Sequence, residues 1–174
     1  MPLSTTSLTL VECDPRHLVA IIDSPDRFEA VSGYQLANGL QEFYTSGAVS
    51  PAWLDALRSA KTADPWRHGF FIIDAQARRV IGTAGFKGPP DSDGVVEIAY
   101  GVAPEYQGRG YATEAAGALV EFARRNAQVR TIRAHTLPEA NASTHVLTKN
   151  GFRYLGEVID PEDGLVWRWE LPRS

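Results

Sequence analysis

The stretch 93–113, DGVVEIAYGVAPEYQGRGYAT, decides the fold of this chain. It reads as an apolar strand over residues 95–102, a break marked by Pro104, and a glycine-bearing turn that opens a long amphipathic helix. Backbone N–H groups at a helix start lack partners, and the helix dipole adds positive partial charge there. The turn 107–112, QGRGYA, therefore predicts a phosphate site. Strand and turn together favour a ligand with a diphosphate at one end and a reactive group further along.

The segments around this stretch predict a mixed sheet with helices. After the turn, apolar residues recur at helical spacing, at Ala112, Ala115, Ala116, Leu119, Phe122 and Ala123. A hairpin of residues 70–74 and 80–87 precedes the stretch, and a strand (131–136), a short helix (141–150) and two closing strands (152–159 and 165–171) follow it. We therefore predict a protein of α+β (mixed α/β) class.

The first part of the chain predicts several short helices. Asp14-Pro15, Ser24-Pro25 and Ser50-Pro51 each pair an N-cap side chain with a proline at the first helical position. Residues 7–12 alternate weakly between apolar and polar and predict an opening strand. Residues 32–47 predict irregular structure or a broken helix.

Composition narrows the class of protein. The length of 174 residues indicates one globular domain. The net charge of −4 gives no support for a nucleic-acid partner. No apolar run approaches the roughly 20 residues of a membrane helix, and the N-terminus does not resemble a signal peptide. The single cysteine, Cys13, fits a reducing cytoplasm. It also excludes a cysteine-based metal cluster within this sequence.

The glycines of the turn also admit an ordinary interpretation. Gly108 and Gly110 permit backbone conformations and a close ligand approach that a Cβ would hinder, but they equally suit a plain loop before a helix. The Lys-Ser/Thr ending of a P-loop is missing, and Thr113 stands where a dinucleotide fingerprint has its third glycine. The context supports phosphate binding without identifying the ligand.

Residues 102–112, VAPEYQGRGYA, resemble motif A of the GNAT superfamily of acyl-CoA N-acyltransferases. Its signature is [Arg/Gln]-x-x-Gly-x-[Gly/Ala], and Gln107, Gly110 and Ala112 fill the three specified places. Residues 141–143 (NAS) and 149–152 (KNGF) resemble the Asn-x-x-Ser-like and Lys-x-Gly-Phe elements of that superfamily. The resemblance covers residues 70–171 and points to the branch of ribosomal-protein N-terminal acetyltransferases.

This resemblance implies the architecture. We expect a single domain over residues 1–174, with a variable acceptor-side part (1–67) and a cofactor-binding core (68–172). The implied sheet is central, mixed and mostly antiparallel, with about six or seven strands flanked by helices. It is expected to splay between its fourth and fifth strands, where the strand 95–102 carries a bulge and separates from the strand 131–136.

The same resemblance implies acetyl-CoA as acyl donor and requires no metal. Its pyrophosphate would lie on the N–H groups of residues 107–112, and its pantetheine arm would run beside residues 98–103 like an added strand. Asn141 would bind the pantetheine, and Lys149 would contact the CoA end. The predicted cofactor-binding residues are Gly101, Val102, Gln107, Gly108, Arg109, Gly110, Tyr111, Ala112, Thr113, Asn141 and Lys149.

Acyl transfer to an amine requires a base, a donor to the oxyanion and sometimes an acid for sulfur. Glu97 is our candidate base, because strand alternation places it on one face with the small residues Ala99 and Gly101. An ordinary solvent-facing glutamate is the competing interpretation, and a water chain could replace it as the base. A backbone N–H near Gly101 or Val102 would serve the oxyanion.

The acid for the departing sulfur is less directly indicated. Many relatives place a tyrosine where this chain has Leu147, so a tyrosine acid at that position is absent. Ser143 resembles the serine of the ribosomal branch and is our candidate catalytic acid. A hydrogen bond within its own helix is the competing role for Ser143, and the reaction can also proceed without an acid.

The acceptor side carries few firm signals. Trp53 and Trp66 are candidate walls of the acceptor site, and Trp66 and His135 are the predicted substrate-contacting residues. An ordinary core or surface histidine is the competing interpretation for His135. The histidines show no metal spacing. The acidic loop 160–164, DPEDG, would attract a cationic amine if it is more than a solvated turn. The acceptor stays open between a peptide or protein N-terminus and a small-molecule amine.

Three functional interpretations remain at this point. The first is an acetyl-CoA-dependent N-acetyltransferase that transfers the acetyl group directly to a primary amine. The second is a catalytically weak acyl-CoA-binding module, which the missing tyrosine favours. The third, a nucleotide-binding regulator, is weakened by the missing third glycine and by the lack of an acidic residue at the required spacing. The exposed edges of such a sheet leave a homodimer open.

Overall fold

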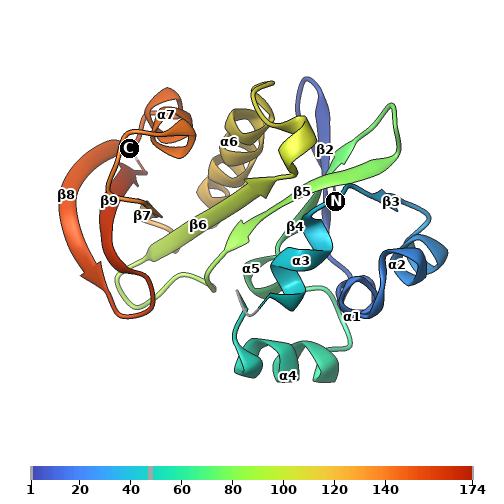
Figure 1. Ribbon diagram of the computed structural model, residues 1–174. Helices are drawn as coiled ribbons and strands as arrows, with labels where there is room; N and C mark the ends of the chain where they lie inside the picture. The colour runs from blue at the N-terminus through green and yellow to red at the C-terminus, as the bar shows by residue number, and fades with distance from the viewer. Residues whose placement is uncertain (1, 47–48, 174) are drawn as a thin grey trace.

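The computed structural model describes residues 2–46 and 49–173. Its described strands form one mixed sheet in the order β1-β2-β4-β5-β6-β7-β9-β8, with β3 paired to β5 (Figure 1). The strands are β1 (Leu3–Ser4), β2 (Leu8–Glu12), β3 (Gln35–Leu36), β4 (Phe70–Asp74), β5 (Arg79–Phe86), β6 (Val95–Val102), β7 (Thr131–Thr136), β8 (Arg153–Asp160) and β9 (Gly164–Pro172). Two pairings, β3 with β5 and β6 with β7, are parallel, and the other neighbours are antiparallel. The α+β class with a mostly antiparallel sheet is confirmed.

The helices begin where the sequence predicts for three of the four that open with proline. They are α1 (Pro15–Asp23), α2 (Pro25–Ser32), α3 (Leu40–Thr45), α4 (Pro51–Ser59), α5 (Pro65–His68), α6 (Tyr111–Arg124) and α7 (Ala142–Lys149), with a 3₁₀ turn at Pro104–Tyr106. Asp14, Ser24 and Ser50 each accept a backbone N–H from the first turn of the helix that follows. Asp64 caps α5 in the same way; this helix was not predicted, although its Asp-Pro signature is the same as that of α1.

The core lies on both faces of the central strands. Strand β4 is buried along almost its whole length, and α6 places Leu119, which is fully buried, against the sheet. Figure 1 shows α6 passing behind β6, whereas α1, α2 and α4 gather at the lower right. Residues 32–47, expected to be irregular or a broken helix, contain β3 and α3, and residue 47 lies outside the described residues.

The sheet opens between β6 and β7. These strands pair only from Val95↔Thr131 to Glu97↔Arg133. Beyond Glu97, β6 stays in register with β5 as far as Gly82↔Val102, while β7 stays in register with β9. The predicted splay between the fourth and fifth strands is therefore confirmed, provided that the two-residue strands β1 and β3 are left out of the count.

The predicted sheet differs from the structure in two details. The described residues form nine strands, of which seven match the predicted count of about six or seven, and the two-residue strands β1 and β3 add short pairings. The expected bulge in β6 is also not found, since its pairing with β5 runs without a register shift from Ile98 to Val102. The strands diverge because each follows a different neighbour in a twisted sheet, and no inserted residue is needed.

Candidate active site

The turn before α6 is held open by its two glycines. Gly108 and Gly110 have φ of 77° and 81°, in the left-handed region that side chains disfavour. A Cβ at either position would meet no atom within 4 Å, so both glycines face open space. Gly110 is the N-cap residue of α6 and offers no side chain to the helix start. The turn therefore exposes main chain rather than side chains.

The backbone N–H groups of this turn are available to a ligand. Among the described residues, no acceptor pairs with the amides of residues 108–113; the first amide to find one belongs to Glu114, which donates to the carbonyl of Gly110. The Gln107 side chain fixes the turn to the end of β6, because its Nε2 donates to the carbonyl of Val102 over 3.0 Å. Unpaired amides at the positive end of a helix dipole form an anion-binding site.

A cavity of about 450 Å³ runs from this turn to α7, and we call it the donor groove. All predicted cofactor-binding residues line it except Arg109 and Asn141. Arg109 folds back instead, donating from Nη2 to the carbonyl of Glu105 over 3.1 Å. Asn141 caps α7 through Oδ1, which accepts from the Thr144 amide over 3.0 Å. The additional lining residues are Tyr100, Tyr106, Ala142, Ser143, His145 and Val146.

A second cavity, of about 570 Å³, lies on the other side of β6, and we call it the acceptor cavity. Side chains from α3, α4, β5, β6 and the loop after β8 line it. It shares Tyr100, Gly101 and Val102 with the donor groove, so the two cavities meet at the end of β6. Groups bound in the two cavities would therefore contact the same three residues.

The two candidate tryptophans occupy different environments. Trp53 of α4 lines the acceptor cavity. Trp66 packs into the core, with its ring centroid 4.6 Å from that of Phe86 and 5.1 Å from that of Phe122, and it does not line the acceptor cavity. The geometry thus favours Trp53 over Trp66 as an acceptor-site wall, and the role of Trp66 stays a prediction.

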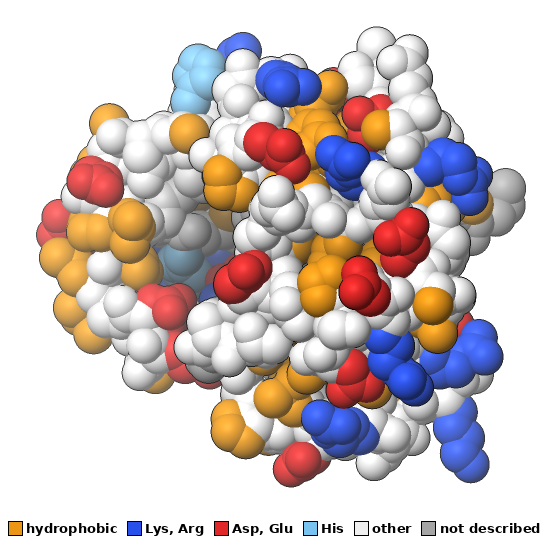
Figure 2. All heavy atoms as spheres, turned by 45° about the vertical axis from the view of Figure 1, so that its right-hand side comes forward, with side chains coloured by type: hydrophobic (Ala, Val, Ile, Leu, Met, Phe, Trp, Pro, Cys, Tyr) orange, Lys and Arg blue, Asp and Glu red, His pale blue; other side chains and the backbone are white. Residues whose placement is uncertain are grey.

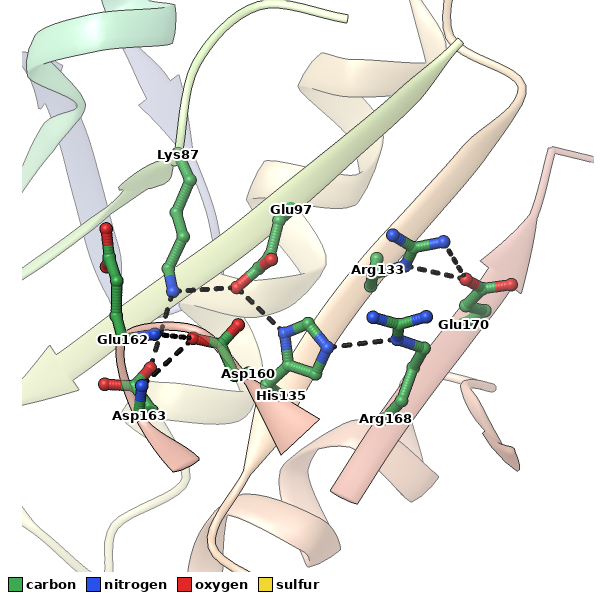
Figure 3. A network of polar contacts seen from close by, with 9 residues as sticks. All are labelled: Lys87, Glu97, Arg133, His135, Asp160, Glu162, Asp163, Arg168 and Glu170. Carbon is green, nitrogen blue, oxygen red and sulfur yellow. Dashed lines mark hydrogen bonds and ion pairs between the residues drawn. The ribbon is translucent and has the colours of Figure 1, made fainter. Parts of the chain in front are cut away.

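Glu97 lies at the centre of a polar network beside the opening of the sheet (Figure 3). Its Oε2 is 2.9 Å from Lys87 Nζ and 3.1 Å from His135 Nδ1. Both contacts fall on one oxygen, and Oε1 has no polar partner among the described residues. Glu97 does not itself line the acceptor cavity, whereas Lys87 and Ala99 do. Its side chain is 19 % exposed, so water is needed to connect it to a ligand there.

The ring of His135 is oriented by the strand next to it. Arg168 Nε donates to His135 Nε2 over 3.1 Å, so in the neutral ring the proton belongs on Nδ1, toward Glu97. The Nδ1 atom is buried and close to Glu97, but its direction does not meet hydrogen-bond geometry. The His135 side chain is only 7 % exposed and lines neither cavity, so its contact with substrate stays a prediction.

Lys87 connects Glu97 to the acidic loop. Its Nζ is 3.8 Å from Asp163, beyond the 2.9 Å contact with Glu97. Burial lowers the pKa of Lys87, but Glu97 and the two loop aspartates outweigh it, so the pKa is raised overall and the amine stays charged. Asp160 Oδ1 accepts the amides of Glu162 and Asp163, and these bonds hold the pKa of Asp160 below its usual range. The loop is thus a defined turn, and Glu162 lines the acceptor cavity.

Ser143 has a partner that our sequence analysis did not identify. The Tyr100 hydroxyl lies 3.0 Å from Ser143 Oγ, across the opening between β6 and α7. Burial raises the pKa of Tyr100, and the bond to Ser143 only partly offsets this, so the phenol stays protonated at neutral pH. The apolar alternation along β6 placed Tyr100 on the apolar face of the strand, so a role for its hydroxyl was not predicted. Leu147, where relatives carry a tyrosine, is fully buried.

Two further findings concern metals and membranes. Within residues 2–46 and 49–173, no group of three or more His, Cys, Asp or Glu side chains is arranged to hold a metal ion. None of the helices in the same ranges is both long enough and apolar enough to cross a bilayer.

Figure 2 shows acidic and basic side chains interspersed on the face in view, with a hollow left of centre that has histidine and basic side chains at its floor.

Comparison with known proteins identifies relatives of this chain in both sequence and fold. The family model described as "Acetyltransferase (GNAT) domain" matches residues 10–153. The uncharacterized N-acetyltransferase p20 of Bacillus licheniformis is 31% identical over 93 residues, which is 53% of this chain and 52% of that protein. The chain thus spans about half the length of the curated relatives it matches.

Two solved structures share the fold along nearly the entire chain. RimL, described as a ribosomal L7/L12 alpha-N-protein acetyltransferase in complex with coenzyme A, aligns with a TM-score of 0.66 at 18% identity and covers 99% of this chain and 98% of its own. A ribosomal-protein-S5-alanine acetyltransferase from Vibrio fischeri aligns with a TM-score of 0.66 at 15% identity and covers 100% and 97%. At such identities the likeness concerns the fold alone.

Proposed function

Since this chain belongs to the GNAT acetyltransferase family, we propose that it transfers an acetyl group from acetyl-CoA to the nitrogen of an amine. One observation carries the proposal: the donor groove and the acceptor cavity share Tyr100, Gly101 and Val102. Two substrates bound on either side of β6 would meet at this point. Transfer can then occur directly, without an acyl group on the protein.

The donor groove has the chemistry that acetyl-CoA requires. The unpaired amides of residues 108–113 would hold the pyrophosphate, and the side chains of His145 and Lys149 line the same groove. The backbone of Gly101 and Val102 would bind the arm of the ligand as an added strand and polarise the carbonyl. When bound, acetyl-CoA supplies a thioester. RimL, which shares this fold, has been solved with coenzyme A.

Glu97 would remove the proton that the attacking amine must lose. Lys87 holds its Oε2, which also lies 3.1 Å from His135 Nδ1, and this leaves Oε1 to accept a proton from a water that reaches the acceptor cavity past Ala99. The neutral nitrogen then attacks the carbonyl carbon, a C–N bond forms, and the negative charge on oxygen is met by a backbone N–H of β6. The nitrogen gives up its second proton to water before the C–S bond breaks. Lys87 and His135 act as positioning residues in this scheme.

The pair of Tyr100 and Ser143 would return a proton to the departing sulfur. When the C–S bond breaks, its electron pair stays on sulfur, which takes the hydroxyl proton of Tyr100 or Ser143. The 3.0 Å bond between these hydroxyls lets one resupply the other. Ser143 would thereby have the catalytic role expected from the sequence and would share it with Tyr100 of β6.

The test is turnover with purified protein, acetyl-CoA and a panel of amines that includes small molecules and peptides. We expect free CoA thiol and N-acetylated product to appear in equal amounts, measured by thiol titration and mass spectrometry. Tight CoA binding with no transfer to any amine would instead favour the acyl-CoA-binding module. Tighter binding of ADP than of CoA would favour a nucleotide-binding regulator.

We take the cytoplasm as the compartment, since free Cys13 is consistent with reducing conditions.

A further inference from the structure

Aromatic rings form one wall of the acceptor cavity. Phe43 and Tyr44 come from α3, Trp53 from α4 and Phe86 from β5. The ring centroids of Phe43 and Tyr44 are 5.1 Å apart, and the rings of Tyr44 and Trp53 stack at 6.3 Å. The contacts join α3 and α4 into a single apolar surface that faces the end of β6.

The polar groups of this wall are uncharged, and that of Trp53 is already paired. Trp53 Nε1 donates to the carbonyl of Arg67 over 3.1 Å, so the indole presents its ring rather than its N–H. Burial raises the pKa of Tyr44, and its phenol stays neutral. Phe43 keeps 49 % of its surface exposed at the cavity. An apolar group packed against Phe43 would therefore remove both surfaces from water, which favours binding.

The charges around the cavity suit a single cation. Arg67 and Lys87 line the cavity, but Arg67 Nε is already 3.2 Å from Asp64, and Lys87 is paired with Glu97. Glu162 is the one carboxylate among the described lining residues, and its side chain has no ion-pair partner among them. Asp163, 3.8 Å from Lys87 Nζ, does not line the cavity, so a second ammonium group inside it would face Arg67 or Lys87 with no further lining carboxylate.

From this wall and this charge pattern we infer that the acceptor is an amine with one positive charge and a bulky apolar body. An aromatic or branched aliphatic group would pack on Phe43 and Trp53, with the nitrogen directed toward Gly101. A free arylalkylamine and a peptide whose first side chain is large and apolar share this chemistry. The inference rests on the proposed function, because it assigns a substrate class to the same site.

Binding without turnover tests this inference separately from the activity. The protein is saturated with CoA, which cannot donate an acetyl group, and is titrated calorimetrically with 2-phenylethylamine, spermidine, and two otherwise identical peptides that begin with Phe or with Ser. We expect 2-phenylethylamine or the Phe peptide to bind about tenfold or more tightly than spermidine and the Ser peptide. Preference between the first two separates a small-molecule acceptor from a peptide acceptor.

Variants assign the preference to the cavity. Phe43→Ser changes an exposed side chain and should weaken the apolar amine about tenfold, while its matched control Leu155→Ser, on exposed β8 outside the cavity, should not. Glu162→Gln keeps the side-chain shape and should weaken every amine, whereas the control Glu157→Gln, exposed on the same hairpin, should leave binding unchanged. CoA affinity should stay constant in all four variants.

Each outcome decides between the inference and the proposed function. Binding of the apolar amine without any acetylation would support the inference and contradict the proposed acetyltransferase activity. Equal or tighter binding of spermidine or of the Ser peptide would overturn the inference, and their acetylation would leave the activity in place. Binding of the apolar amine that is unaffected by Phe43→Ser and Glu162→Gln would place the acceptor elsewhere and overturn the inference as well.

Discussion

The two sides of β6 are built by different means. The donor groove takes its ligand-facing groups from the main chain of β6 and of the turn that follows it, closed by one face of α7. The acceptor cavity is formed by side chains from α3, α4, β5 and the loop after β8, which are far apart in the sequence. A site made of backbone amides tolerates most side chains, whereas a site made of side chains changes with each of them. The donor groove should therefore be sensitive to backbone changes, and the acceptor cavity to individual side chains.

The largest effect is expected for Gly110→Glu. The residue has φ of 81°, so a side chain strains the turn, and a carboxylate there repels a pyrophosphate. We expect acetyl-CoA affinity to fall about a hundredfold or more, as measured by calorimetry. Gly33→Glu is the matched control, because Gly33 has φ of 80° at the end of α2, faces open space and lines neither cavity. An unchanged Kd for Gly110→Glu would contradict the assignment of the pyrophosphate to this turn.

Glu97→Gln tests the side-chain contribution next. The amide keeps the size of the carboxylate but accepts no proton, so kcat should fall about a hundredfold, while acetyl-CoA affinity stays unchanged. Steady-state kinetics and calorimetry together measure this division between catalysis and binding. Glu121→Gln on α6, whose side chain is 69% exposed, serves as control. Wild-type kcat in Glu97→Gln would make Glu97 a structural member of its network.

Tyr100→Phe removes one hydroxyl from the point where the two cavities meet. We expect kcat to fall about tenfold, with little change in acetyl-CoA affinity. The phenol donates only below its pKa, which burial raises above the usual value of 10.0. The wild-type advantage over Tyr100→Phe should therefore persist as pH rises to 10.0 and disappear only above the raised pKa. Tyr154→Phe, on exposed β8, is the control, and an advantage lost near neutral pH would contradict the assignment.

The smallest effect is expected for Asp160→Ala. Its carboxylate accepts two loop amides, and the lowered pKa keeps it ionised at all pH values above 3.8. Loss of these bonds should loosen Glu162 and raise KM for the amine about threefold, with acetyl-CoA affinity unchanged. Asp91→Ala is the matched control, since Asp91 also accepts two amides in a turn but lines neither cavity. A larger change in acetyl-CoA affinity than in KM would break the separation of the two sides.

The donor side could be read from the sequence because its determinants are local. The glycines of residues 107–112, the apolar alternation of β6 and the stripe of α6 each act within a few residues, and the strand bounds 95–102 and 131–136 were predicted without error. The bulge in β6 was implied by resemblance alone, and the structure has no need of it, because pairing with β5 continues in register.

The acceptor side could not be read in this way because its contacts depend on tertiary structure. Glu97 and His135 lie on different strands and Lys87 directly follows β5, and only the parallel pairing of β6 with β7 brings Glu97 close to His135. Tyr100 was assigned to the apolar face of β6, and its bond to Ser143 depends on where α7 packs. The sequence alone does not distinguish Trp53 from Trp66. Only the fold shows that Trp53 lines the acceptor cavity and that Trp66 packs in the core.

The most direct measurement is calorimetric titration of the wild-type protein with acetyl-CoA, CoA and ADP. ADP carries a diphosphate but lacks the pantetheine arm that would lie along Gly101 and Val102. Our account predicts micromolar binding of acetyl-CoA and CoA and at least about tenfold weaker binding of ADP, because the arm contributes contacts along β6. No binding of acetyl-CoA, or equal binding of ADP, would contradict the claim that the donor groove reaches from the turn to the meeting point of the two cavities.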